Sequence, residues 1–361
     1  MNVFEKIKFI LRKPKVIIVT GSGRSCAREA IFQVLNQHFK VGDEILLFET
    51  DLKDKKEFEF FVKKSSLPIL VVTHIGDIPF DKDFFAGEKE ETIEIRKLAK
   101  ISPPYGHLIL NFDDETVREI GDELRSSSRF ANARVKDETN LKEITFGFQE
   151  RADFRATDIK LNGGTNFKIN YKGNIVPIWL DGLFGKEQIY SALAAVVVGT
   201  IFDLNLVEIS QALKNYKSLP GKMRLVEGIN QSWILDDSQS ATVFSMAEAI
   251  EIFGIIPGFK RKIAVLGDVT GIGKYTIEAH EAIGERVAKN VDLLFTFGPK
   301  AKFIAQGAQQ KGLPLEKIFQ FDTINEGKLK LREEIKEGDI ILVDGSKEME
   351  MGKIVEEIKK V

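Results

Sequence analysis

Short apolar runs rich in β-branched residues alternate with segments of helical period through most of this 361-residue chain. That alternation predicts βαβ units, in which buried parallel strands are joined by crossover helices. In the first half, strands are expected at 16–20, 45–49, 69–73 and 108–112, and helices at 25–39, 55–63, 89–100 and 115–124. This half is therefore expected to be an α/β domain with a mainly parallel sheet.

The hydrophobic period changes to two between residues 130 and 180. It predicts strands at 144–148, 154–161, 167–171 and 175–179. Asn162-Gly163-Gly164 and Lys172-Gly173-Asn174 are typical of hairpin turns between such strands. We expect a small meander of antiparallel strands here.

A break in the chain follows two helices expected at 188–202 and 206–216, because Pro220-Gly221 interrupts the helical pattern. After it come five strands alternating with helices, at 232–235, 262–266, 293–297, 318–321 and 339–343. Five such units make a complete doubly wound (Rossmann-like) α/β domain. We therefore predict two domains, 1–219 and 220–361.

Composition narrows the function classes. Fifty-two basic against 54 acidic residues give a net charge of −2, so nothing indicates a nucleic-acid partner. Cys26 is the one cysteine and there are four histidines, which exclude an intrachain disulfide and argue against a Cys/His zinc site. The apolar run in residues 1–15 is too short and too charged for a transmembrane segment or a signal peptide. A short amphipathic helix and a cytoplasmic location are expected.

The first strand runs into a glycine-rich turn and then a helix, which is the layout of a phosphate-binding loop. The turn consists of Thr20, Gly21, Ser22, Gly23, Arg24 and Ser25. No lysine follows the glycines, so Arg24 or Arg28 would supply the cation and Ser25 the metal-binding hydroxyl. On these residues alone, a tight turn without a ligand fits equally well.

Asp236-Asp237-Ser238 ends a predicted strand, where an α/β sheet exposes side chains to its crevice. The two carboxylates could bind magnesium or a ribose hydroxyl. Alternatively, Asp237 or Ser238 caps the helix that begins near Val243. Gly267-Asp268 has the same two interpretations, and His280 is expected to be a helical histidine with satisfied hydrogen bonds.

Several motifs of the second half occur in the order found in the Mur ligase family. They are Leu219-Pro220-Gly221-Lys222-Met223, 235–241 with Ser245-Met246, 264–269 and 339–347. In the first half, Thr20-Gly21-Ser22, Glu49, 72–76 and 110–114 match as well. The chain thus resembles this family, and in particular the branch that completes the peptidoglycan stem peptide.

The resemblance implies an ATP-dependent, amide-forming ligase fold that makes an acyl phosphate and lets an amine attack it. According to the resemblance, residues 20–25 would surround the phosphates of ATP, and Ser25 and Glu49 would bind Mg²⁺. Asp237 would contact the nucleotide. Glu49 and Lys222 would be catalytic, and Ser346 and Lys347 would contact substrate. The implied partners are a nucleotide and a cell-wall precursor or a partner protein.

The chain also departs from the family pattern. Because the phosphate loop begins at about residue 20, the N-terminal domain that grips the uridine nucleotide in the family is expected to be missing. Arg24 stands where the loop lysine is expected. The carbamylated lysine falls at Ile95 and the metal-binding histidine at Ile78-Pro79.

Further departures lie at nucleotide-contacting positions. Gly185-Lys186-Glu187-Gln188 replaces Gly-Arg-His-Asn, and adenine-contacting asparagines fall on Ser191 and Ser240. Two hypotheses remain: a catalytically impaired protein with a binding or scaffolding role, or an active ligase for a different or partner-presented acid.

Overall fold

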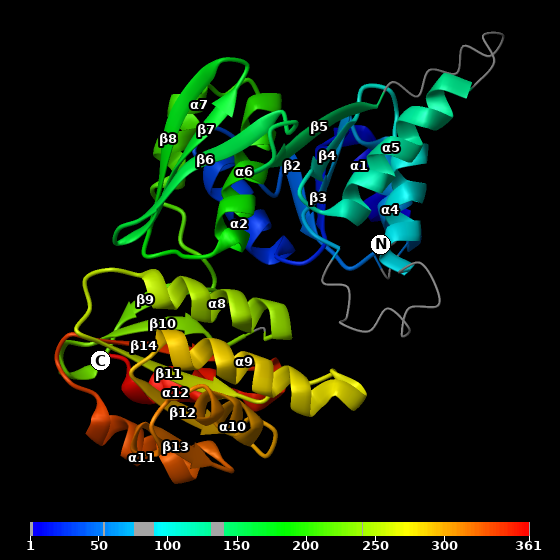
Figure 1. Ribbon diagram of the computed structural model, residues 1–361. Helices are drawn as coiled ribbons and strands as arrows, with labels where there is room; N and C mark the ends of the chain where they lie inside the picture. Colours follow the sequence, from blue (N-terminus) through cyan, green and yellow to red (C-terminus); the bar gives the residue numbers. More distant parts are fainter. Residues whose placement is uncertain (1–2, 53–54, 76–89, 131–140, 240, 361) are drawn as a thin grey trace. The chain divides into compact units, whose positions relative to one another are not determined.

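The computed structural model describes residues 3–52, 55–75, 90–130, 141–239 and 241–360. These residues form two compact units (Figure 1). The first comprises Met1–Ile159, Asn166–Leu180 and Lys186–Lys217, and the second comprises Lys160–Thr165, Asp181–Gly185 and Ser218–Val361.

An eight-stranded sheet with the strand order β2-β1-β3-β4-β5-β6-β7-β8 organises the first unit. Its strands are β1 (Lys15–Thr20), β2 (Ile45–Glu49), β3 (Leu67–Val72), β4 (His107–Asn111), β5 (Lys142–Gly147), β6 (Phe154–Leu161), β7 (Gly164–Tyr171) and β8 (Asn174–Asp181). Its helices are α1 (Val3–Arg12), α2 (Arg24–Leu35), α3 (Lys55–Lys64), α4 (Glu90–Ile101), α5 (Glu115–Phe130), α6 (Lys186–Ile201) and α7 (Leu206–Leu213).

Helices cover both faces of the parallel strands, as the unbroken apolar runs predict. Val16 and Ile18 of β1 point to one face, where they share a core with side chains of α1, α3, α4 and α5. Ile17 and Val19 point to the opposite face, because side chains alternate along a strand. That face belongs to α2 and α6, which pack against each other (Figure 1).

The place of β5 differs from the expectation. We expected it to open the antiparallel meander, but it pairs in parallel with β4, with Ile144 opposite Ile109 and Phe146 opposite Asn111. A period of two shows only that one face is more buried than the other, whereas the crossover through α5 sets the strand direction. The antiparallel part is confined to β6, β7 and β8, which are joined by tight turns at Gly163 and Gly173 with positive φ.

A second sheet, with the order β13-β12-β11-β14-β10-β9, forms the second unit. Its strands are β9 (Arg224–Glu227), β10 (Trp233–Asp237), β11 (Arg261–Gly267), β12 (Leu293–Phe297), β13 (Ile318–Phe321) and β14 (Asp339–Asp344). Its α-helices are α8 (Val243–Ile255), α9 (Thr276–Asn290), α10 (Lys302–Gln310), α11 (Ile324–Glu334) and α12 (Gly352–Ile358). Short 3₁₀ helices are η2 (Ile229–Gln231), η3 (Gly273–Tyr275), η4 (Leu315–Lys317) and η5 (Lys347–Met349).

The predicted doubly wound α/β fold of this unit is confirmed. Strands β10 to β14 are parallel, and β9 is added antiparallel at the edge beside β10. Helices α8, α9 and α10 pack on one core of the sheet and α11 and α12 on another. Of the helices that the structure describes in either unit, none combines the length and apolar composition that a bilayer crossing requires.

Candidate functional site

Two glycines shape the turn that follows β1. Gly21 and Gly23 have φ values of 99° and 76°, a region that side-chain-bearing residues rarely adopt. Space is also restricted, since a Cβ on Gly21 would lie 2.5 Å from the carbonyl oxygen of His74 and 2.6 Å from Oγ1 of Thr73. The glycines are therefore required by the turn itself, whether or not a ligand binds.

The segment after β3 holds this turn by hydrogen bonds. The amide of Ser22 donates to the carbonyl of His74 at 2.5 Å. Thr73 Oγ1 lies 2.9 Å from the carbonyl oxygen of Thr20 and 2.6 Å from that of Ser22. In a phosphate-binding loop such amides point at the anion. Here the Ser22 amide is used within the protein.

His74 is in turn fixed by Asp114, whose Oδ2 lies 2.7 Å from His74 Nδ1. Burial pushes the pKa of the Asp114 carboxyl up, but hydrogen bonds from His74 and from the amides of Val117 and Ile75 outweigh it, so that pKa is lowered. Asp114 thereby caps α5 and anchors the loop after β3 at the same time.

Helix α2 begins directly after Gly23, which offers no side chain to cap it. Arg24 folds back, and its Nη1 donates to the carbonyl of Gly21 at 3.2 Å. The side chain of Glu187, at the start of α6, lies against Gly23: a Cβ built there would be 2.9 Å from its Cγ and 3.5 Å from Oε1. A carboxylate at the positive end of α2 occupies the place where an anionic ligand would be favoured.

The two predicted metal ligands lie on the same side of the sheet. Glu49 ends β2 directly beside Val19, so its side chain points to the face that carries α2. Ser25 is in the first turn of α2. Among the residues that the structure describes, no group of three or more His, Cys, Asp and Glu side chains is arranged to hold a metal ion.

The positions where the family has its other metal ligands, Ile95 and Ile78-Pro79, provide no described ligand besides Glu49 and Ser25. Ile95 is fully buried in the core beneath α4. Its neighbours Arg96 and Lys97 form ion pairs with Glu123 and Glu94 at 2.8 and 2.7 Å. Ile78-Pro79 lies outside the described residues, as does Ser240.

A buried polar network replaces the expected nucleotide contacts at the start of α6. The hydroxyl of Tyr216 lies 2.9 Å from Oε1 of Gln188 and 3.3 Å from the carbonyl oxygen of Cys26, either of which can accept its proton. Ser191, one turn further along α6, is also buried. These side chains join α6 to α2 and do not face solvent.

As arranged, the loop does not fit the triphosphate of ATP with Mg²⁺. The Ser22 amide is engaged by His74, Glu187 lies where an anion would bind, and Glu49 and Ser25 are the remaining metal ligands among the described residues. Phosphoryl transfer depends on positioned cations. Arg24 is the positively charged residue of this loop, and its Nη1 donates to the Gly21 carbonyl at 3.2 Å.

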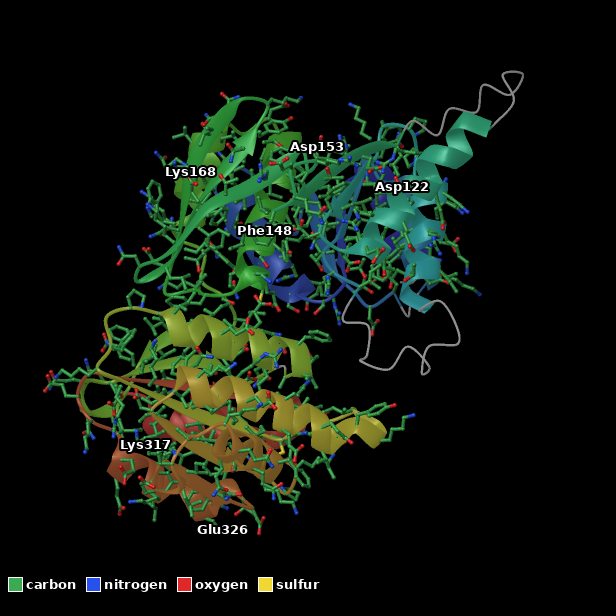
Figure 2. The ribbon with its side chains drawn as sticks, viewed as in Figure 1. Asp122, Phe148, Asp153, Lys168, Lys317 and Glu326 are labelled. Atoms are coloured by element: carbon green, nitrogen blue, oxygen red, sulfur yellow. The ribbon has the colours of Figure 1, made fainter. Side chains whose placement is uncertain are left out.

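A cavity of about 800 Å³ opens at the carboxyl ends of β4 and β5. It is lined by Phe112, Arg118, Asp122, Arg125, Phe148, Gln149, Glu150, Arg151 and Arg155. Four guanidinium groups against two carboxylates make the lining basic. Arg118 and Arg155 are oriented by donating to the carbonyls of Phe112 and Phe148, the latter labelled in Figure 2.

Asp113 holds together the two segments that line this cavity. Its carboxylate accepts hydrogen bonds from the amides of Phe148 and Gln149 at 2.7 and 3.1 Å and from the hydroxyl of Tyr190 at 3.1 Å. The end of β5 is thereby held against the end of β4. Of the lining arginines, Arg125 forms ion pairs with Asp122 and Glu143, and Arg155 lies 3.6 Å from Glu150.

In the second unit, the paired aspartates hold the Pro-Gly turn. Asp236 accepts from the Gly221 amide at 2.8 Å, and Asp237 accepts from the Met223 amide at 3.2 Å. The suggestion that Asp237 or Ser238 caps α8 is wrong. Thr242 caps that helix in a reciprocal pair with Ser245, because the chain continues four more residues before it turns helical.

Asp344, at the end of β14, is an unusual group in this region. It is completely buried, and burial raises the pKa of its carboxyl to about 8. The Gly345 amide and the positive charge of Lys222 oppose that rise, while the charge of Asp236 adds to it.

The remaining predicted residues of this unit have structural contacts. Ser346 is buried and its Oγ accepts from the Thr270 amide at 2.9 Å, whereas Lys347 is exposed. Asp268 accepts from the amides of Lys300 and Ala301 just before α10. His280 is buried with both ring nitrogens hydrogen-bonded, as expected, and burial lowers its pKa.

Comparison with known proteins agrees with both units. A family model described as the Mur ligase glutamate ligase domain matches residues 221–347. The chain is 23% identical to UDP-N-acetylmuramoyl-tripeptide–D-alanyl-D-alanine ligase of Bacillus subtilis, over 95% of this chain and 76% of that protein. The Escherichia coli protein of the same name is 28% identical, over 58% of this chain and 45% of its own length.

Solved structures show the same fold. MurF from Acinetobacter baumannii superposes with a TM-score of 0.77 at 18% identity, covering 97% of this chain and 78% of that one. MurF ligase from Thermotoga maritima in complex with ADP gives 0.73 at 19% identity, covering 98% and 81%.

The two units have the fold of the P-loop-type central domain and the C-terminal α/β domain of Mur ligases. Residues 221–347 match the glutamate ligase domain of Mur ligases, and the chain resembles the UDP-N-acetylmuramoyl-tripeptide–D-alanyl-D-alanine ligase branch over nearly all of its length.

Sequence reasoning missed three features of the site. The Thr73–His74 segment was noted only as a motif match, and its hydrogen bonds to the loop have no signal in the sequence. Glu187 was noted as a departure from the family pattern, but its position against Gly23 depends on the packing of α6 on α2. The basic cavity draws on residues 112–125 and 148–155, which come together only in the sheet.

Proposed function

We propose that this chain is a Mur-ligase-like protein of cytoplasmic cell-wall precursor synthesis that acts by binding or scaffolding, with weak or absent ATP turnover. The observation that carries the proposal is the carboxylate of Glu187 against Gly23. A negative charge at that point opposes the β and γ phosphates of ATP, which the helix end would otherwise attract.

The metal ligands support the same conclusion. Glu49 and Ser25 can each supply one oxygen ligand. Two protein ligands can suffice for one magnesium ion when phosphates and waters complete its octahedral coordination. A second ion would have to neutralise the developing acyl phosphate. With Ile95 buried in the core, the described part of the chain offers no carbamylated lysine for it.

The basic cavity gives the binding role a candidate site. Arg118, Arg125, Arg151 and Arg155 suit the diphosphate and carboxylate groups of a cell-wall precursor, because guanidinium pairs well with both. The relatives are named for a UDP-linked muramoyl tripeptide substrate, which carries such groups. We propose that an anionic precursor of this class binds at the ends of β4 and β5.

The test combines calorimetry with a turnover assay. We expect UDP-N-acetylmuramoyl peptides to bind to the wild type and to bind at least about tenfold more weakly to an Arg118→Ala/Arg151→Ala variant. Phosphate release from ATP and Mg²⁺, with acid and amine substrates present, should stay at background.

A turnover assay can also contradict this proposal. Turnover of about 1 per second or more, within the usual enzyme range, that disappears in a Glu49→Ala variant would overturn the proposal. The protein would then be an active ligase for a different or partner-presented acid.

A further inference from the structure

Helix α1 exposes its apolar side chains to solvent. Phe4, Ile7 and Leu11 are spaced three and four residues apart, so they form one stripe along the helix. Their exposed fractions are 83%, 51% and 79%, and Ile10 beside them is 42% exposed. An amphipathic helix of a globular protein normally buries this stripe, so its exposure here needs a partner.

A different side of α1 attaches it to the first unit. Phe9 is 6% exposed and packs on Phe60 and Phe61 with ring centroids 5.4 and 5.1 Å apart. Phe9 is two residues from both Ile7 and Leu11, which puts it roughly opposite the stripe on a helix of 3.6 residues per turn. The helix can therefore stay docked through Phe9 while the stripe contacts something else.

Positive charge accompanies the stripe. Residues 4–13 contain Lys6, Lys8, Arg12 and Lys13 and a single acid, Glu5. Lys8 lies next to the stripe on one flank, and Arg12 follows it one turn later and also pairs with Asp43 at 2.7 Å. Lys6 lies nearer to Phe9, with its ammonium 5.6 Å from the Phe60 ring centroid. Long basic side chains on the flanks of an apolar face are typical of helices that lie in the headgroup region of a bilayer.

We propose that α1 docks the protein on an anionic lipid surface, with Phe4, Ile7 and Leu11 in the acyl boundary and Lys8, on the flank of the stripe, at the phosphates. A ten-residue helix is about 15 Å long, which suits an orientation in the plane of the interface and not across it. The charge complementarity selects an anionic bilayer over a neutral one. This inference does not depend on the proposed binding of a cell-wall precursor.

The experiment is sedimentation of the full chain with vesicles of phosphatidylcholine alone or with 30% phosphatidylglycerol. Near an anionic surface each basic residue strengthens binding, so we expect at least about tenfold stronger partitioning to the mixed vesicles at low salt, reduced by 0.5 M NaCl. A Phe4→Glu/Leu11→Glu variant should lose at least about tenfold of that partitioning.

Leu329→Glu is the matched control, because Leu329 is a 63% exposed leucine on α11. It should partition like the wild type. Since the substituted side chains are exposed, all three proteins should have the same thermal unfolding midpoint. Equal partitioning of the wild type and the Phe4→Glu/Leu11→Glu variant would overturn the proposal. So would a wild type that does not bind vesicles but forms a dimer that the Phe4→Glu/Leu11→Glu substitutions abolish.

Discussion

At the scale of single residues, we expect the carboxylate of Glu187 to control how strongly the glycine turn after β1 binds an anion. Replacing Glu187 with Gln keeps the shape beside Gly23 and removes the charge. We expect affinity for ATP or pyrophosphate to rise about tenfold, because the positive end of α2 is no longer compensated. The free energy of unfolding should fall by about 0.5 kcal/mol for the same reason. Calorimetric titration and urea denaturation measure the two effects.

Glu59→Gln is the control, since Glu59 is a half-exposed acid of the same unit paired with Lys63 on α3. It should leave nucleotide affinity unchanged. Equal affinities of the wild type and Glu187→Gln would show that Glu187 has no influence on the phosphate site.

Asp344 makes the stability of the second unit depend on pH. Its pKa rises from 3.8 to about 8 on folding, so the folded state holds a proton that the unfolded state releases above pH 4. Stability is therefore highest below pH 4 and declines towards pH 8. An Asp344→Asn variant, which cannot ionise, should be more stable than the wild type by roughly 1–3 kcal/mol at pH 8 and show no advantage at pH 4.

Thermal or urea unfolding at a series of pH values checks this expectation. Asp322→Asn, at an exposed position after β13, provides a comparison with the same chemical change. A constant difference between wild type and Asp344→Asn from pH 4 to 8 would mean that Asp344 is ionised in the folded protein throughout.

At the scale of elements, Asp114 connects the loop after β3 to the start of α5. Its carboxylate accepts from the amides of Ile75 and Val117 and contacts His74, and these bonds lower its pKa. A lowered acid pKa contributes stability that is present above pH 3.8 and is lost as the pH falls through the folded value. Asp114→Ala should cost about 2–3 kcal/mol at pH 7.

Urea denaturation at pH 7 and pH 3 measures that cost, which should shrink at pH 3. Asp122→Ala removes an exposed acid from the same helix and should cost less than about 0.5 kcal/mol. If both variants lost equal stability, Asp114 would not be the anchor of this loop.

At the scale of the whole molecule, we expect limited proteolysis to cut between about residues 215 and 230, releasing a folded fragment from 222 to 361. The fragment lacks Phe184, which is buried in the core of the second unit with Leu235 and Met246. It also lacks the bond from the Leu225 amide to the carbonyl of Gly182. Loss of a buried phenylalanine should lower its stability by about 3–5 kcal/mol relative to that unit in the intact chain.

Circular dichroism and thermal unfolding of the isolated fragment check both statements. Adding a peptide that spans 181–185 to the fragment is a further check, since it carries the missing phenylalanine. Cleavage at no preferred place between 215 and 230 would contradict a domain boundary near Ser218–Lys222.

Most of the architecture could be predicted because it depends on local patterns. The apolar strands, the crossover helices and the doubly wound second unit follow from hydrophobic period and from breaks such as Pro220-Gly221. The parallel pairing of β5 with β4 could not be predicted, because the alternation of Ile144 and Phe146 is the same whether the strand runs parallel or antiparallel to its neighbour. Likewise, Asp236 and Asp237 were recognisable as a polar pair, but their hydrogen bonds to Gly221 and Met223 belong to a turn 14 residues or more earlier in the chain.

The sequence by itself determined that Thr20 to Ser25 is a glycine turn between a strand and a helix, and that the family's lysine is absent from it. Only the tertiary structure decided what surrounds that turn: the His74 carbonyl on the Ser22 amide, and the Glu187 carboxylate beside Gly23. The reason is physical. Backbone conformation is set by neighbours along the chain, whereas the electrostatic field at a site is set by side chains that come from distant segments and meet only when the helices pack on the sheet.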